Sequence, residues 1–122
     1  MARDQRRLVD QALALYPTSG LTVMVACEAH LLTGEIDQAI ATCEKASART
    51  NNLFAVQLML AAAYANRGDM AKAAAAKAEA LRYTPGFTIA LAKQQHGNNP
   101  EYVSLAEKYL YGGLRKAGFP ER

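Results

Sequence analysis

The sequence predicts an all-α fold made of antiparallel helical hairpins stacked one on the next. Alanine, the best helix former and a poor strand former, supplies 25 of the 122 residues. Two glycine-acid pairs, Gly34-Glu35 and Gly68-Asp69, have the composition of a tight turn between helices. These pairs lie 34 residues apart, and the residues around them correspond at the same offset. Together the three observations indicate a helical repeat protein.

The chain is expected to form a single domain, because 122 residues and 13.2 kDa suffice for one core. With so much alanine, that core must come from close helix contact rather than from bulky side chains. The expected helices cover residues 3–15, 20–33, 36–48, 53–66, 70–83, 87–96 and 100–117.

The first expected helix, residues 3–15, corresponds to the second helix of a repeat whose first helix would lie upstream. Met1 is therefore expected to begin a piece of a longer protein. Two hairpins follow, residues 20–48 and 53–83, each with its turn at a glycine. In the second hairpin Gly68 supplies the positive φ that ends one helix, Asp69 caps the next, and Pro85 stops it.

The last two expected helices depart from the period, because Gln94 and Gln95 occupy the places where Leu60 and Ala61 would recur. They are predicted to close the array as a cap. The final helix has a strong start signal in Asn99-Pro100-Glu101, which combines a capping side chain, a proline in the first turn and an acid favoured by the helix dipole.

The 34-residue correspondence extends over both hairpins. Ala39 falls on Ala73, and Ala46 falls on Ala80. The remaining matches are Ile36 with Met70, His30 with Tyr64, and Asn51 with Pro85, and one further step back reaches Ala12 and Pro17.

This pattern resembles the tetratricopeptide repeat (TPR). The better copy carries the resemblance through Leu60, Ala61, Tyr64, Gly68, Ala73, Ala80 and Pro85, and the earlier copy through Cys27, His30, Gly34, Ala39 and Ala46. The resemblance implies a short right-handed superhelix with a C-terminal capping helix. It divides the chain into residues 1–19 (second helix of a truncated repeat), 20–53 and 54–87 (repeats), and 88–122 (degenerate, capping helices). Ala73 and Ala80 would then lie where neighbouring helices cross, so that alanine sets the spacing.

The segment 83–122 carries a second resemblance. Its end, GLRKAGFPE from Gly113 to Glu121, is similar to the tail of many bacterial TPR regions attached to class III adenylate and guanylate cyclases. This implies a regulatory module, non-catalytic in itself, at the C-terminus of a nucleotide cyclase. Related repeats also follow winged-helix transcription regulators or stand alone as adaptors, so those parents remain alternatives.

The same tail has a structural interpretation. Leu105, Tyr109, Leu110 and Leu114 recur at roughly helical spacing, so they are predicted to cover the apolar edge of the last hairpin. Gly112-Gly113 lowers helix stability, and either close approach of another helix or a kink would account for it.

Charge and hydropathy exclude several classes. The net charge of +3 and pI near 9.0 come without aromatic interleaving or a binding motif, so nucleic acid is not an expected partner. The longest apolar stretch, which begins at Leu53, is too short to span a bilayer, so no membrane insertion is expected. Cys27 and Cys43 lie on the paired helices of one hairpin, where they can come near each other. They are predicted to be small buried hydrophobes in a reducing compartment, which favours the cytoplasm.

No arrangement of nucleophile and base, paired carboxylates, phosphate-binding loop or metal ligands appears in the sequence, so neither catalysis, a metal nor a cofactor is predicted. His30 takes the place of Tyr64 in the earlier copy and is predicted to be a packed, hydrogen-bonded residue, whereas His96 is expected at the surface.

Surface recognition remains, and the groove of such a superhelix is lined mainly by first helices. The predicted groove residues are Leu21, Met24, Glu28, Leu31, Ala55, Leu58, Ala62, Ala65 and Asn66. TPR grooves that grip a terminal carboxylate use Lys, Arg and Asn, and here only Asn66, with Arg67 at the edge, is of this kind. The expected partner is an apolar helix or extended segment, from another protein or from the parent's catalytic domain, with homodimerisation left open.

Overall fold

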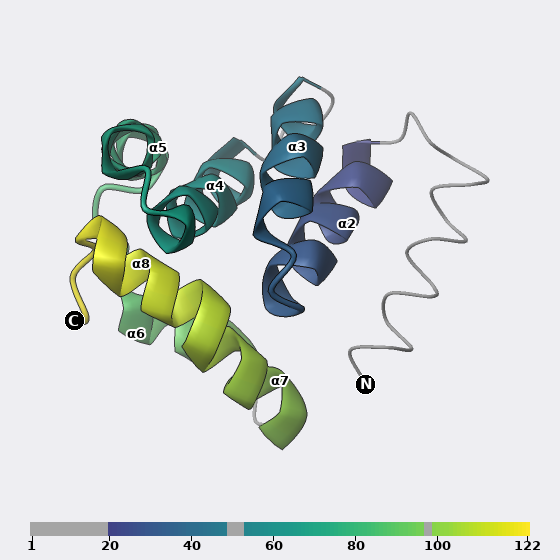
Figure 1. Ribbon diagram of the computed structural model, residues 1–122. Coiled ribbons are helices and arrows are strands. Elements are labelled where there is room, and N and C mark those ends of the chain that lie inside the picture. Colours follow the sequence, from purple (N-terminus) through teal and green to yellow (C-terminus); the bar gives the residue numbers. More distant parts are fainter. Residues whose placement is uncertain (1–19, 49–52, 97–98) are drawn as a thin grey trace.

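The computed structural model describes residues 20–48, 53–96 and 99–122, and for residues 20–23 and 95–96 it describes the backbone alone (Figure 1). The expected helix at 3–15, Pro17 and Asn51 lie outside these ranges, as do the side chains of Leu21 and His96.

The regular structure of the described ranges is entirely helical, which confirms the all-α class. Four helices form the first part of the chain: α2 (Gly20–Leu32), α3 (Ile36–Ser47), α4 (Leu53–Arg67) and α5 (Met70–Tyr83). Each packs against the next one along the chain. In Figure 1, α2 and α3 lie together on one side of α4, and α5 lies on the other. The ends of these helices agree with the predicted ends to within a residue.

Glycine ends the first helix of each pair, as predicted. Gly34 and Gly68 have φ angles of 81° and 90°, in the left-handed region that side chains disfavour. The Asp69 carboxylate accepts a hydrogen bond from the backbone N–H of Lys72 at 3.3 Å, which confirms its predicted capping role.

The alanines at the repeat positions form the close contacts between helices. Ala39, Ala46, Ala73 and Ala80 are all fully buried. The hydroxyl of Tyr64, a largely buried residue, donates a hydrogen bond to the Glu44 carboxylate at 3.3 Å. A methyl group fills little space, so the backbones of adjacent helices approach closely at these points.

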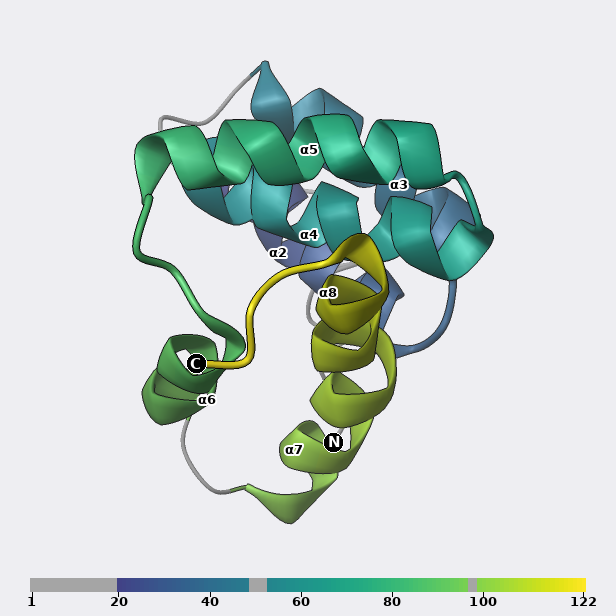
Figure 2. The ribbon, with the colours of Figure 1, turned by 90° about the vertical axis from the view of Figure 1, so that its left-hand side faces the viewer.

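After α5 the chain turns through the exposed Pro85 and enters α6 (Ile89–His96), two residues later than predicted. The later start follows from how its first N–H groups are satisfied. The backbone N–H of Ile89 donates to the Pro120 carbonyl at 2.9 Å, and that of Ala90 donates to the Glu121 carbonyl at 2.8 Å. Figure 2 shows the C-terminus beside α6.

The final helical run comprises α7 (Pro100–Leu105), a π-helical segment η1 (Ala106–Tyr111) and α8 (Gly112–Ala117). The Asn99 side chain caps it by accepting a hydrogen bond from the Tyr102 N–H at 3.1 Å, as predicted. Gly118, with φ of 97°, ends it. The predicted helix 100–117 is therefore confirmed in extent, and its π-helical middle is an addition from the structure.

This C-terminal helical run crosses α4 (Figure 2), with Leu110 and Leu114 buried at the contact. Gly113 marks the closest approach, since a Cβ there would lie 2.7 Å from the carbonyl oxygen of Ala62. The Tyr109 ring covers Gly34, where a Cβ would lie 2.8 Å from the tyrosine oxygen. Close helix contact therefore accounts for Gly113.

Three aromatic rings join the tail to the remainder of the core. The rings of Phe54 and Phe87 meet edge to face with centroids 5.3 Å apart, and Phe87 meets Phe119 in the same way at 5.8 Å. Phe119 belongs to the GLRKAGFPE segment, as does Arg115, which forms ion pairs with Glu107 at 2.7 Å and with Glu121. Within the second resemblance, Phe119 thus packs the tail into the aromatic cluster, whereas the ion pairs of Arg115 lie within the tail.

Cys27 and Cys43 are both fully buried, as expected, but the structure joins them in a disulfide. The prediction of two unlinked side chains is therefore wrong. Each cysteine lies eight residues from Glu35, so the antiparallel packing of α2 and α3 places their Cα atoms 5.1 Å apart, within disulfide range. Stable disulfides are typical of oxidising compartments, so this pairing weighs against the predicted reducing compartment.

Candidate binding groove

A pocket of about 240 Å³ opens between α2, α4, α6 and η1, and we call it the open groove. It contains five of the residues predicted from the repeat period. Those residues are Met24, Glu28 and Leu31 from α2, and Ala55 and Leu58 from α4. The 34-residue offset places Met24 on Leu58, so the same face of two successive first helices forms this surface.

The remaining lining residues were not predicted. They are Val25, Phe54, Met59, Phe87, Ala92 and Leu110. Phe87, Ala92 and Leu110 lie beyond Pro85, where the repeat period lapses and offers no assignment of faces. The clearest available signal was the pair of aromatic residues at Phe54 and Phe87, because aromatic side chains line many binding pockets.

The open groove is apolar except at Glu28. Leu31 forms part of its fully buried floor, while Met24 and Leu58 are half-buried and reach its surface. Moving apolar side chains out of water lowers the free energy, so this surface favours an apolar ligand.

Glu28 lies half-buried in the wall of the groove. Burial raises the pKa of its carboxyl group, and no basic side chain among the described residues opposes that shift. Two tyrosines of the C-terminal helical run lie within electrostatic reach. Burial raises the pKa of Tyr102, and the charge of Glu28 raises it further; burial, Glu107 and then Glu28 raise the pKa of Tyr111.

The other predicted groove residues of α4 lie under the C-terminal helical run, and we call Ala62, Ala65 and Asn66 the covered segment. Ala62 is fully buried beneath Gly113, and Ala65 is 4% exposed. The Asn66 side-chain amide donates a 2.7 Å hydrogen bond to the Tyr109 carbonyl. In this conformation the chain's own helix occupies the place predicted for a partner.

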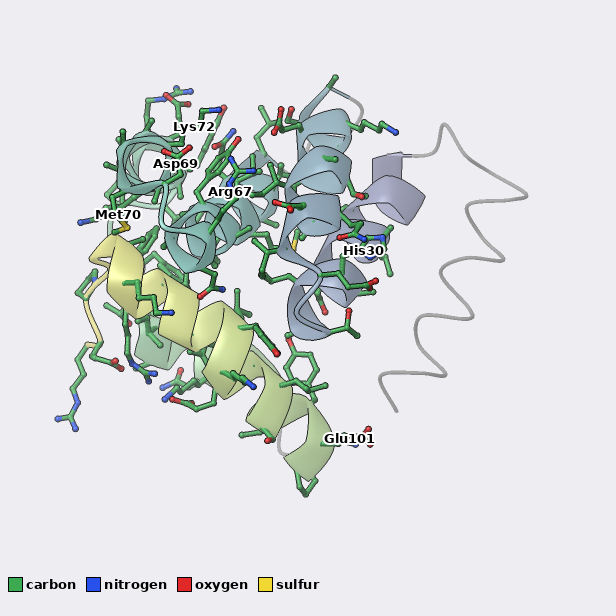
Figure 3. All side chains as sticks on the ribbon, in the orientation of Figure 1. His30, Arg67, Asp69, Met70, Lys72 and Glu101 are labelled. Carbon is green, nitrogen blue, oxygen red and sulfur yellow. A yellow bond between two sulfur atoms is a disulfide. The ribbon has the colours of Figure 1, made fainter. Side chains whose placement is uncertain are left out.

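Arg67, the basic residue predicted at the groove edge, points elsewhere. Figure 3 shows it with Asp69 and Lys72 around the turn between α4 and α5. Its guanidinium group lies 3.5 Å from the Asp37 carboxylate and 3.6 Å from that of Asp69. Because Asn66 binds Tyr109 and Arg67 pairs with acids, these two residues do not form a pair of donors for a terminal carboxylate.

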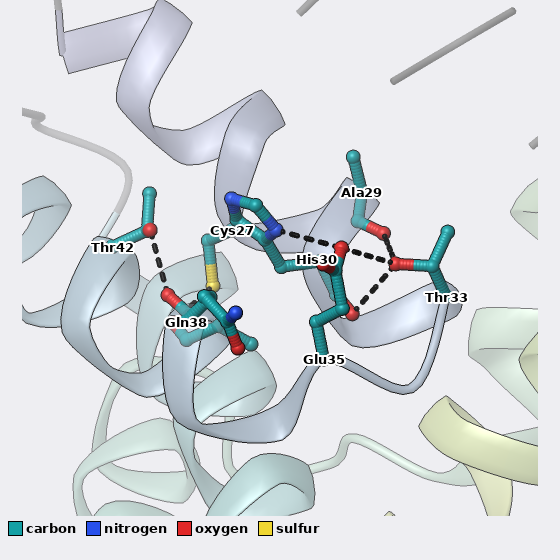
Figure 4. A network of polar contacts seen from close by, with 8 residues as sticks. Cys27, Ala29, His30, Thr33, Glu35, Gln38 and Thr42 are labelled. Carbon is teal, nitrogen blue, oxygen red and sulfur yellow. Dashed lines mark hydrogen bonds and ion pairs between the residues drawn. The ribbon is translucent and has the colours of Figure 1, made fainter. Parts of the chain in front are cut away.

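His30 belongs to a polar network at the end of α2 (Figure 4). Its Nδ1 lies 3.1 Å from a Glu35 carboxylate oxygen, which also accepts a 3.0 Å hydrogen bond from the Thr33 hydroxyl. The same Thr33 hydroxyl lies 2.9 Å from the Ala29 carbonyl, so its single proton is shared between the two acceptors. This network closes the last turn of α2, which agrees with the predicted hydrogen-bonded role of His30.

Within the described ranges, no cluster of His, Cys, Asp and Glu side chains has the arrangement of a metal site. Nor is any helix in those ranges both long enough and apolar enough to cross a membrane.

Comparison with known proteins gave no match to a protein-family model, to a curated protein or to a solved structure.

Proposed function

We propose that this chain is a protein-binding module, non-catalytic in itself, built on TPR-like hairpins. Its open groove would receive an apolar segment of a partner. The observation that carries the proposal is the convergence of Met24, Leu31 and Leu58, from two successive first helices, on one accessible apolar pocket.

The order of the hairpins supports the TPR-like part of the proposal. Each of α2, α3 and α4 packs against its successor, and both hairpins turn at a positive-φ glycine. The small residues shared by the two copies are buried where helices meet. These features are expected of a repeat in which each unit buries its apolar face against its neighbours.

The size of the open groove favours a peptide over a cofactor. Its volume of about 240 Å³ falls below the roughly 300–1,000 Å³ of sites that enclose a drug-sized molecule. It suits one or two apolar side chains presented by a helix or an extended segment, as in other helix-in-groove recognition.

The test is selection of peptides from a randomised 12-residue phage-displayed library, followed by fluorescence anisotropy with the enriched peptides. Leu58→Glu places a charge in the open groove and should weaken binding at least about tenfold. Gln57→Glu adds the same charge one residue away, beside Tyr64 and Lys72 on another surface, and should leave binding unchanged. Circular dichroism verifies that both variants fold. Equal binding by the wild type and both variants, or no enriched peptide, would contradict the proposal.

We also propose, from the resemblance of residues 83–122, that the parent is a bacterial class III nucleotide cyclase. A winged-helix regulator or a stand-alone adaptor is the alternative. Sequencing the coding DNA upstream of Met1 separates them, because a continuous frame with the two metal-binding aspartates of a cyclase domain is expected. A stop codon or a winged-helix domain in that place would overturn the cyclase parent and leave the groove proposal intact.

A further inference from the structure

The open groove combines an apolar lining with a single ionisable side chain, Glu28. This inference rests on the function proposed above and concerns the chemistry of the bound segment. Because Glu28 is half-buried, any ligand that fills the groove removes more water from its carboxylate. That loss of hydration opposes binding unless the ligand supplies a compensating partner.

The chain itself supplies no such cation from its described residues. None of the residues that line the groove is basic. Two basic side chains of α6 and the tail are paired with another acid, since Lys93 lies 3.2 Å and Arg115 lies 2.7 Å from the Glu107 carboxylate. Both cations are therefore held at Glu107, on the helical run that borders the groove.

We propose that the segment bound in the open groove carries a lysine or arginine beside its apolar anchor residue, and that this cation pairs with the Glu28 carboxylate. Lysine and arginine suit the place for a second reason. Their aliphatic stems pack along apolar walls such as Met24 and Leu58, while the charged end reaches the carboxylate. An acidic segment is disfavoured, because it would bring like charges together where little water remains.

Glu28 then acts as a selector among apolar ligands. A purely apolar segment would leave the carboxylate buried without a partner, whereas a basic apolar segment turns the same group into an attractive contact. The partner is therefore a protein segment with one large apolar residue and one basic residue near each other, displayed on a helix or an extended strand.

The peptides selected above provide the test, through a double-mutant cycle between protein and peptide. The enriched peptides that need Leu58 should contain Lys or Arg, and replacing that residue by Gln should weaken binding to the wild type about tenfold. The same replacement should change binding to Glu28→Gln by less than about twofold, because the partner charge is gone. Glu79→Gln, on the exposed side of α5, is the matched control and should retain the full tenfold effect.

The outcomes separate the two proposals. Peptides that need Leu58 but lack a basic residue, or a cycle in which Glu28→Gln does not alter the effect of the Lys→Gln replacement, would overturn this inference alone. Failure to obtain any peptide that depends on Leu58 would overturn the proposed function, and this inference with it.

Discussion

The open groove and the covered segment lie on the same helix, α4, yet they differ in what touches them. Around Leu58 the side chains are large and leave a pocket of about 240 Å³. Around Ala62 and Ala65 the side chains are small, and the C-terminal helical run lies directly on the backbone at Gly113. Small residues permit close helix contact and large ones hold the helices apart, so residue size determines which part of the surface remains accessible.

Truncating a leucine at the open groove and one in the helix that lies on the covered segment should give the largest difference. Leu114 is fully buried against the core, whereas Leu58 is half-buried at the groove. Leu114→Ala should lower the free energy of unfolding by about 3 kcal/mol, and Leu58→Ala by about 1 kcal/mol, because part of the Leu58 side chain already contacts water. Urea denaturation measures both. Equal losses would show that the tail is not packed on α4 as described.

A methyl group at the crossing point should have the next largest effect. In Gly113→Ala the new Cβ would lie 2.7 Å from the Ala62 carbonyl oxygen, and a backbone atom cannot rotate away. We expect a loss of about 2 kcal/mol of unfolding free energy, despite the better helix propensity of alanine. Gly86→Ala is the matched control, since a Cβ there meets nothing within 4 Å. If the two variants unfold at the same urea concentration, the close contact is contradicted.

The sequence predicts those features of the two regions that have a local sequence signal. Gly34, Gly68 and Asn99 are signals of helix ends, so the boundaries near them were predicted closely. The face containing Met24 and Leu58 follows from the 34-residue offset. The sequence also predicts that the C-terminal helix covers the last hairpin, but not that it lies on the covered segment, because nothing in α4 alone indicates that Gly113, about fifty residues later, packs on Ala62.

The other omissions have the same origin. The disulfide depends on the packing of α2 against α3, and the capping of α6 by the Pro120 and Glu121 carbonyls depends on the return of the tail. A π-helical turn such as that at Ala106–Tyr111 has no capping residue or hydrophobic period to signal it. These features depend on tertiary contacts, which local sequence patterns do not reveal.

Removing the hydrogen bond that ties the covered segment to the tail should have a smaller effect. Asn66→Ala removes the 2.7 Å donor to the Tyr109 carbonyl and a 3.4 Å contact with the Lys116 ammonium group. The expected loss is about 1 kcal/mol of unfolding free energy, because the carbonyl is left without this donor. Amide hydrogen exchange should speed up in residues 106–117 and remain unchanged in α2. An equal change in exchange rate in residues 106–117 and in α2 would contradict a local role for this hydrogen bond.

The smallest effects concern pH, where Glu28 in the open groove and Glu107 in the C-terminal helical run should behave oppositely. Burial raises the folded-state pKa of Glu28, so its contribution to stability falls as pH rises from the unfolded pKa through the folded one. At Glu107 burial acts in the same direction, but hydrogen bonds from Arg115 and Lys93 outweigh it and lower the pKa. Its stabilising contribution is present above the unfolded pKa and is lost as pH falls through the folded one.

Glu28→Gln should therefore be more favourable at pH 7 than at pH 3. Glu107→Gln should be less favourable at pH 7 than at pH 3. The difference should be less than about 1 kcal/mol, because the ion pairs of Glu107 are exposed to solvent. Urea denaturation of both variants and the wild type at the two pH values measures these differences. The same sign for both variants would contradict the contrast.

In the proposed complex, a partner binds the open groove while the tail stays on the covered segment. Methyl-selective NMR of the chain with a peptide enriched by selection tests it most directly. We expect intermolecular contacts to the methyl groups of Met24 and Leu58, with the contacts between Leu114 and α4 preserved. Peptide contacts to Ala62 or Leu114, with loss of the tail from α4, would show that the partner displaces the C-terminal helical run. That result would contradict binding at the open groove with the tail in place.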